Sequence, residues 1–174
     1  MKKTILACIA ILLLTVVFLG FAQALLMPKY MSASREGALI AEELAKEGYP
    51  AFIGPSFGAK TKIELRNKDF ATVNALYEAG VPVSIITDAP VIPLEHLPMC
   101  AGFAIKAGLP YEEAWKAITI NPAKATGIGD RVGSLEVGKD GDVVIWNGDP
   151  LTDIGTIAYT TIVNGKVAYA GEED

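Results

Sequence analysis

The 174-residue chain is poor in the side chains that build metal sites and nucleophilic sites, because it holds one histidine, His96, and two cysteines, Cys8 and Cys100. With a single histidine it contains no His-x-His pair. It also lacks an excess of positive charge, since its formal net charge is −5. Nucleic-acid-binding domains usually carry a basic patch. The charge balance therefore argues against a nucleic-acid partner.

A long apolar run occurs at the N-terminus. Met1-Lys2-Lys3 is a basic start, residues 5–21 are apolar, and Ala22-Gln23-Ala24 offers small residues before a cleavage point. This layout predicts a signal peptide at residues 1–24 and a secreted or periplasmic protein. The alternative is a retained membrane anchor, because about 17 apolar residues suffice for a spanning helix. Residues 5–21 would then be the contact with the membrane.

Cysteine and histidine usage favours structural roles. If residues 1–24 are removed, Cys100 is the one remaining cysteine, so no intramolecular disulfide is possible and the fold must depend on its apolar core. Cys100 lies in an apolar helical stretch, where core packing is the expected role. His96 is expected in the same helix as a partly buried or surface residue.

The middle of the chain repeats one unit of helix, Gly-x-Pro and apolar strand. A helical pattern at residues 34–48 leads into a strand at 51–53, and a second pattern at 70–80 leads into a strand at 83–87. A spacing of about thirty residues is that of one β/α crossover. The repeat predicts two parallel, neighbouring strands joined by a helix. Residues 25–34 give an ambiguous pattern.

Asp88 follows the second predicted strand directly. That strand is apolar on both faces, as in a parallel sheet covered by helices on both sides. Because α/β folds hold their active sites at the carboxyl ends of strands, Asp88 is the candidate catalytic residue. Lys60, Lys62 and Glu64 follow the first strand on the same side and are weaker candidates for substrate binding. Solvated loop charges are the alternative interpretation of these three.

The C-terminal part of the chain has a different pattern. Helices are predicted at residues 95–107 and 111–118, and antiparallel β structure follows Gly129. We expect a short alternating strand at 134–137, a buried strand at 142–146, and a hairpin around Asn164-Gly165, a strong two-residue turn signal. The domain prediction is an α/β unit at residues 25–128 and a β unit at residues 129–174.

Four segments carry a family resemblance: Ile85-Ile86-Thr87-Asp88-Ala89-Pro90, Thr119-Ile120-Asn121-Pro122-Ala123-Lys124, residues 132–146 and residues 162–167. With them the chain resembles the C-terminal part of the amidohydrolase superfamily, specifically the imidazolonepropionase-like metal-dependent hydrolases. The resemblance covers most of the chain from about Ile40 onward.

The resemblance implies an α/β fold: the last two β/α units of a TIM-like (β/α)8 barrel, left incomplete, plus a small antiparallel β-sandwich segment. It implies hydrolysis of C–N bonds in a non-peptide or cyclic amide, or in a small amide or dipeptide, with a divalent metal ion, zinc, as cofactor. Asp88 matches the aspartate that binds this metal and acts as general base toward the metal-bound water.

The chain departs from the family pattern in ways that favour a second hypothesis. A complete barrel needs about 250 residues, and a catalytic zinc needs about three protein ligands. Ala89 stands where close relatives often have histidine. The alternative is therefore a truncated or split, non-catalytic fragment that acts as an assembly or binding module. A third, weaker interpretation is an independently folded α/β protein that acquired its leader by recombination.

Two strands cannot close a barrel. The sequence therefore predicts open strand edges and inward-facing side chains without partners, namely Phe52, Ile53, Val83 and Ile85. Open apolar edges favour pairing with another chain. We expect self-association or pairing with a complementary barrel fragment.

Overall fold

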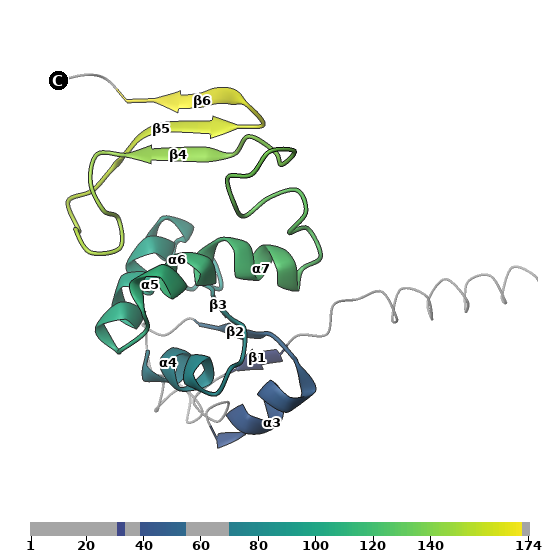
Figure 1. Ribbon diagram of the computed structural model, residues 1–174. Coiled ribbons are helices and arrows are strands. Elements are labelled where there is room, and N and C mark those ends of the chain that lie inside the picture. Colours follow the sequence, from purple (N-terminus) through teal and green to yellow (C-terminus); the bar gives the residue numbers. More distant parts are fainter. Residues whose placement is uncertain (1–30, 34–38, 55–69, 172–174) are drawn as a thin grey trace, which may run out of the picture.

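The computed structural model describes residues 31–33, 39–54 and 70–171 (Figure 1). Its elements in chain order are β1 (Met31–Ala33), α3 (Ala41–Glu47), β2 (Ala51–Ile53), α4 (Ala71–Glu78), β3 (Val83–Ile85), the 3-10 turn η2 (Leu94–His96), α5 (Leu97–Lys106), α6 (Tyr111–Ile118), α7 (Ile120–Ala125), β4 (Val143–Trp146), β5 (Ala158–Val163) and β6 (Lys166–Ala170). In this part of the chain the strands form two sheets of three strands each.

The predicted signal peptide at residues 1–24, and its alternative, a membrane anchor through residues 5–21, lie outside the described residues. Among the helices that are described, none is both long enough and apolar enough to cross a membrane.

The first sheet is parallel, with strand order β1-β2-β3. Ala51 lies opposite Val83 and Ile53 opposite Ile85, which confirms that the two predicted strands are parallel neighbours. The structure adds β1 to them, because Met31 pairs with Ala51 on the other side of β2. The described residues therefore form an open three-stranded sheet with no closed barrel.

The helices that feed this sheet end at glycine, as the sequence predicts. Gly48 follows α3 in the left-handed conformation, with φ of 71°, and its N–H donates to the carbonyl oxygen of Ala45. Gly80, with φ of 86°, ends the turn after α4 in the same way. A side chain other than glycine is strained in this conformation. α3 begins at Ala41, later than the predicted start at Ser34, which lies outside the described residues.

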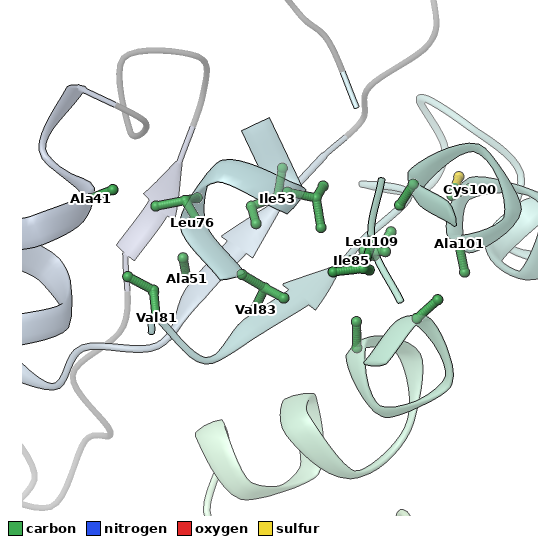
Figure 2. Packing of buried hydrophobic residues seen from close by; sticks show 14 of the residues in the cluster. Ala41, Ala51, Ile53, Leu76, Val81, Val83, Ile85, Cys100, Ala101 and Leu109 are labelled. Carbon is green, nitrogen blue, oxygen red and sulfur yellow. The ribbon is translucent and has the colours of Figure 1, made fainter. Parts of the chain in front are cut away.

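One apolar cluster joins the sheet to the helices beside it (Figure 2). Ile53, Val83 and Ile85 belong to this cluster and are 3%, 2% and 3% exposed. The prediction that these three side chains lack partners is therefore wrong. Because successive side chains of a strand point to opposite faces, these odd-numbered residues face the helices, whereas Phe52 and Ser84 lie on the other face of the sheet.

The helices after β3 agree closely with the sequence pattern. The predicted helix at 95–107 is divided into η2 and α5, whose first turn holds Pro98, a residue tolerated there because the first turn needs no N–H donor. α6 has the predicted bounds. Cys100 is 1% exposed and packs in the core, as predicted.

The second sheet is antiparallel, with order β4-β5-β6, and Figure 1 shows it beyond α5, α6 and α7. Asn164 and Gly165 connect β5 to β6, with φ values of 50° and 72°. Two successive residues at positive φ are what a two-residue type I′ hairpin turn requires. The predicted hairpin is confirmed.

Two predictions about this sheet are wrong. Residues 134–137 form no strand: the N–H of Lys139 donates to Glu136 O, and Leu135 is 77% exposed. β4 is a strand but is not buried, since Val144 and Ile145 are 41% and 47% exposed. The cause is the same in both cases. Among the described residues no strand pairs with the outer edge of β4, so neither segment gains a complete set of neighbours.

Candidate functional site

Asp88 lies just past the carboxyl end of β3, where the chain turns sharply. Its side chain is exposed and its φ is 53°. This left-handed conformation is uncommon outside glycine, but aspartate is among the residues that tolerate it. The carbonyl oxygen of Asp88 accepts a 2.9 Å hydrogen bond from the N–H of Val91, which closes the turn. The turn thus holds the carboxylate in solvent at the end of the sheet where such folds bind substrates.

Gly54, the residue after β2, lies beside this turn. A Cβ at position 54 would overlap the carbonyl oxygen of Ile86, two residues before Asp88. Only glycine allows the ends of β2 and β3 to approach so closely. Lys60, Lys62 and Glu64 follow Gly54 in the sequence but lie outside the described residues, so their role in substrate binding stays a prediction.

The described residues do not fit a zinc site by themselves. Within them, no three histidine, cysteine, aspartate or glutamate side chains come together. His96 lies exposed on η2, and Cys100 is buried in α5, where burial raises the pKa of its thiol to about 11. A catalytic zinc needs about three protein ligands. Asp88 could be one of them, but the described residues do not bring two more such side chains to it.

Ser84 is a polar residue that no sequence motif singles out. It lies in the middle of β3, is fully buried, and its Oγ has no hydrogen-bond partner among the described residues. The feature of the sequence that could have pointed to Ser84 is a single hydroxyl side chain within an apolar strand. An unpaired buried hydroxyl lowers the free energy of unfolding by about 1–3 kcal/mol. Serine at this position therefore reduces the stability of the fold.

Asn121 contacts the strand that leads to Asp88. Its Nδ2 donates a 2.9 Å hydrogen bond to the carbonyl oxygen of Val83, thirty-eight positions away in the chain. The sequence showed Asn121 only as part of a family segment. The contact therefore emerges only from the fold.

A shallow hollow of about 450 Å³ lies between α7 and the loop that follows it. Its charged lining residues are Lys124, Asp130, Glu136 and Lys139. The Nζ of Lys139 donates to Ser134 Oγ at 2.6 Å and lies 3.3 Å from Glu136 Oε1. Hydrogen bonds from Ser134 and Lys139 hold the pKa of Glu136 below its ordinary value. Asp88 does not line this hollow, which is separate from the candidate site.

Comparison with curated proteins finds related hydrolases. The chain is 34% identical over 119 residues to the imidazolonepropionase of Bacillus velezensis. The aligned residues make up 67% of this chain and 27% of the relative. The chain thus spans less than a third of that relative's length.

Two solved structures are similar in fold. The amidohydrolase of Thermotoga maritima superimposes with a TM-score of 0.75 at 35% identity, covering 79% of this chain and 36% of that one. An adenosine deaminase of Xanthomonas campestris with bound zinc has a TM-score of 0.57 at 22% identity, covering 76% of this chain and 34% of that one. At that identity the second likeness concerns the fold alone.

The amidohydrolase family itself matches residues 19–168 of the chain. The match confirms the resemblance that residues 85–90, 119–124 and 132–146 carry, with imidazolonepropionases among the relatives. Because it extends over most of the chain, this protein belongs to the amidohydrolase family.

Proposed function

We propose that this chain supplies the catalytic aspartate of a metal-dependent hydrolase that cleaves C–N bonds in a cyclic amide, a small amide or a dipeptide. The observation that carries the proposal is the position of Asp88, exposed in a tight turn at the carboxyl end of a parallel strand. Membership of the amidohydrolase family supports the reaction class.

Asp88 can serve such a reaction in two ways. Its ionised carboxylate accepts hydrogen bonds and can bind a cation, and it can take a proton from water that attacks a carbonyl carbon. The described residues hold too few ligands for a catalytic zinc by themselves. In this proposal the further ligands lie outside the described residues, on this chain or on a partner.

The location and partners follow the sequence patterns. Residues 1–24 support export as a secreted or periplasmic protein, or anchoring through residues 5–21. The substrate is a small amide. Self-association, or pairing with a complementary barrel fragment, is supported by exposed apolar side chains on the second sheet: Val167 and Tyr169 on β6 are 64% and 53% exposed.

A second candidate function is a non-catalytic assembly or binding module. The observation that favours it is the lack of a ligand group around Asp88 in the described part of the chain. In that case the exposed apolar side chains of β4, β5 and β6 would carry the function by contacting another polypeptide.

One experiment separates the two. The full chain is purified, dialysed against zinc, analysed for bound metal, and assayed for hydrolysis of imidazolone propionate and of a panel of dipeptides. We expect bound zinc and turnover that falls at least about 100-fold in Asp88→Asn, the range of general-base contributions. Glu95→Gln, which removes an exposed carboxylate from η2, is the matched control and should keep full activity. A chain without metal and without turnover would exclude catalysis by this chain alone, leaving the assembly module or a site completed by a partner.

A further inference from the structure

The hollow between α7 and the loop that follows it is lined by charges of both signs. Two of its side chains are positive and two are negative: Lys124, Lys139, Asp130 and Glu136. Lys139 and Glu136 pair with each other, since Lys139 Nζ lies 3.3 Å from Glu136 Oε1. Lys124 and Asp130 make no ion pair with any residue in the described part of the chain. The hollow therefore presents one ammonium group and one carboxylate that a ligand can pair with.

The loop that lines the hollow, which Figure 1 shows between α7 and β4, is tied together by two contacts. Arg131 Nη2 donates a 2.6 Å hydrogen bond to Asp140 Oδ2, and the N–H of Asp140 donates to Arg131 O at 2.7 Å. These contacts join the turn that holds Asp130 to the turn that holds Lys139. A site whose walls are fixed before binding loses less conformational entropy when a ligand enters.

Lys124 is positioned by a glycine of the same loop. A Cβ at Gly129 would lie 2.9 Å from Lys124 Cγ and 3.2 Å from Lys124 Cα. Glycine therefore lets the loop backbone lie directly against the lysine, which no larger residue would allow without a shift. The apolar stem of Lys124 packs on the loop, and its charged end stays in solvent, as is usual for lysine.

The charges of the hollow favour a small zwitterion over a simple ion. An anion drawn to Lys124 would also meet the carboxylates of Asp130 and Glu136, and a cation drawn to Asp130 would meet the two ammonium groups. Because like charges brought together disfavour a partner, neither simple ion fits well. A molecule with one group of each sign pairs with both Lys124 and Asp130.

The remaining lining favours an apolar group on that molecule. Ile120 and Val137 also line the hollow, and Val137 is fully exposed, so a ligand side chain can remove apolar surface from water there. The volume of about 450 Å³ lies in the lower part of the range for small-molecule sites. An α-amino acid with an apolar side chain combines all three features.

The contacts beside the hollow favour binding over catalysis. Lys139 Nζ donates to Ser134 Oγ at 2.6 Å, and Ser134 Oγ donates to Glu136 Oε1 at 2.6 Å. A nucleophilic hydroxyl needs a base that takes its proton. Hydrogen bonds from Ser134 and Lys139 lower the pKa of Glu136, which makes this carboxylate a weak base.

We propose that this hollow binds a free α-amino acid with an apolar side chain, with the ligand carboxylate against Lys124 and the ligand ammonium group against Asp130. Asp88 does not line the hollow, so amino-acid binding here does not depend on hydrolase activity.

The test is isothermal titration calorimetry of the full chain with three probes of similar shape. L-Leucine carries both charges, L-leucinamide carries the positive one alone, and 4-methylpentanoate carries the negative one alone. We expect saturable binding of leucine and weaker binding of both analogues. Lys124→Met and Asp130→Asn should each weaken leucine binding about fivefold, the upper range for an exposed ion pair. Lys106→Met and Glu112→Gln, which remove exposed charges outside the hollow, are the matched controls and should bind leucine like the wild type.

Amide chemical shifts of the wild-type chain locate the site without any substitution. Leucine should move the NMR signals of Gly129 and Gly138, which line the hollow, and leave that of Gly48, after α3, unchanged. The absence of saturable leucine binding would overturn the proposal, as would an analogue that binds as tightly as leucine or shifts confined to other segments. Leucine binding at wild-type strength by either folded single-charge variant would equally overturn it. Because the probes and the shifts use the wild-type chain, they decide the matter even where a variant fails to fold.

Discussion

Gly102, in the middle of α5, lies against the backbone of Leu151 so closely that a Cβ at position 102 would overlap the Leu151 carbonyl oxygen. Leu151 is 5% exposed and belongs to the same apolar cluster as Cys100 on α5. The segment between β4 and β5 is thus attached to the helical layer. Asp149 shapes this segment, because its Oδ1 accepts a 3.0 Å hydrogen bond from the N–H of Leu151.

Gly102→Ala should therefore lower stability, although alanine in a helix interior is ordinarily about 1 kcal/mol better than glycine. We expect a loss of about 1–3 kcal/mol, the usual cost of overpacking, measured by urea unfolding. Gly155→Ala is the control, since its φ lies outside the left-handed region and the nearest heavy atom to the added methyl is a side-chain oxygen, Asp153 Oδ1, at 3.3 Å. A Gly102→Ala protein as stable as wild type would show that the two segments do not pack as described.

Leu76 should be the most costly apolar side chain of α4 to remove. It is fully buried between the helix and the sheet. Truncation to alanine leaves a cavity, and Leu76→Ala should lower the free energy of unfolding by about 2–5 kcal/mol. Leu39→Ala is the matched control, because Leu39 is 85% exposed and should change stability by less than about 0.5 kcal/mol. Equal effects of the two substitutions would contradict the assigned core.

Ser84→Ala should be neutral or stabilising, by up to about 1–2 kcal/mol, because it removes a buried hydroxyl that has no partner in the described part of the chain. Ser134→Ala is the comparison, since that hydroxyl is paired with Glu136 and Lys139 at 2.6 Å and should lose a little stability. Thermal unfolding of both variants measures the difference. A clear loss of stability in Ser84→Ala would mean that its hydroxyl is paired in solution.

Because of the Cys100 thiol, the free energy of unfolding should depend on pH in the alkaline range. Burial raises its pKa from 9.0 to about 11. The folded state therefore keeps the proton longer than the unfolded state, so this contribution is complete below about pH 9 and is lost as the pH rises toward about 11. Its size is about 2–3 kcal/mol. Unfolding curves from about pH 8 to about pH 11 should fall less steeply for Cys100→Ala than for wild type, and parallel curves would argue against the burial.

Local signals predicted much of this fold. Gly48 and Gly80 end their helices, and Asn164-Gly165 forms the hairpin turn, because each depends on backbone conformations that few residues adopt. The position of Asp88 after a parallel strand could also be predicted, since an apolar run followed by an acid is a contiguous pattern. Family membership followed from the same kind of contiguous segments and is confirmed.

Other features could not be predicted because they depend on partners far away in the chain. Met31–Ala33 has little strand preference of its own and becomes a strand by pairing with β2. Residues 134–137 alternate like a strand but form none, because the described residues offer them no partner. The candidate zinc ligands beyond Asp88 were not predicted, and within the described residues no three such side chains come together.

By itself the sequence determined the family, the ends of the helices, the hairpin and the carboxylate at the end of β3, since these depend on neighbouring residues. The tertiary structure alone decided which side chains of β2 and β3 meet the helices, and that Asn121 binds Val83 O at 2.9 Å. It also decided that Gly102 must leave room for Leu151. Such contacts join segments far apart in sequence, and their geometry depends on how whole elements pack, which no local pattern specifies.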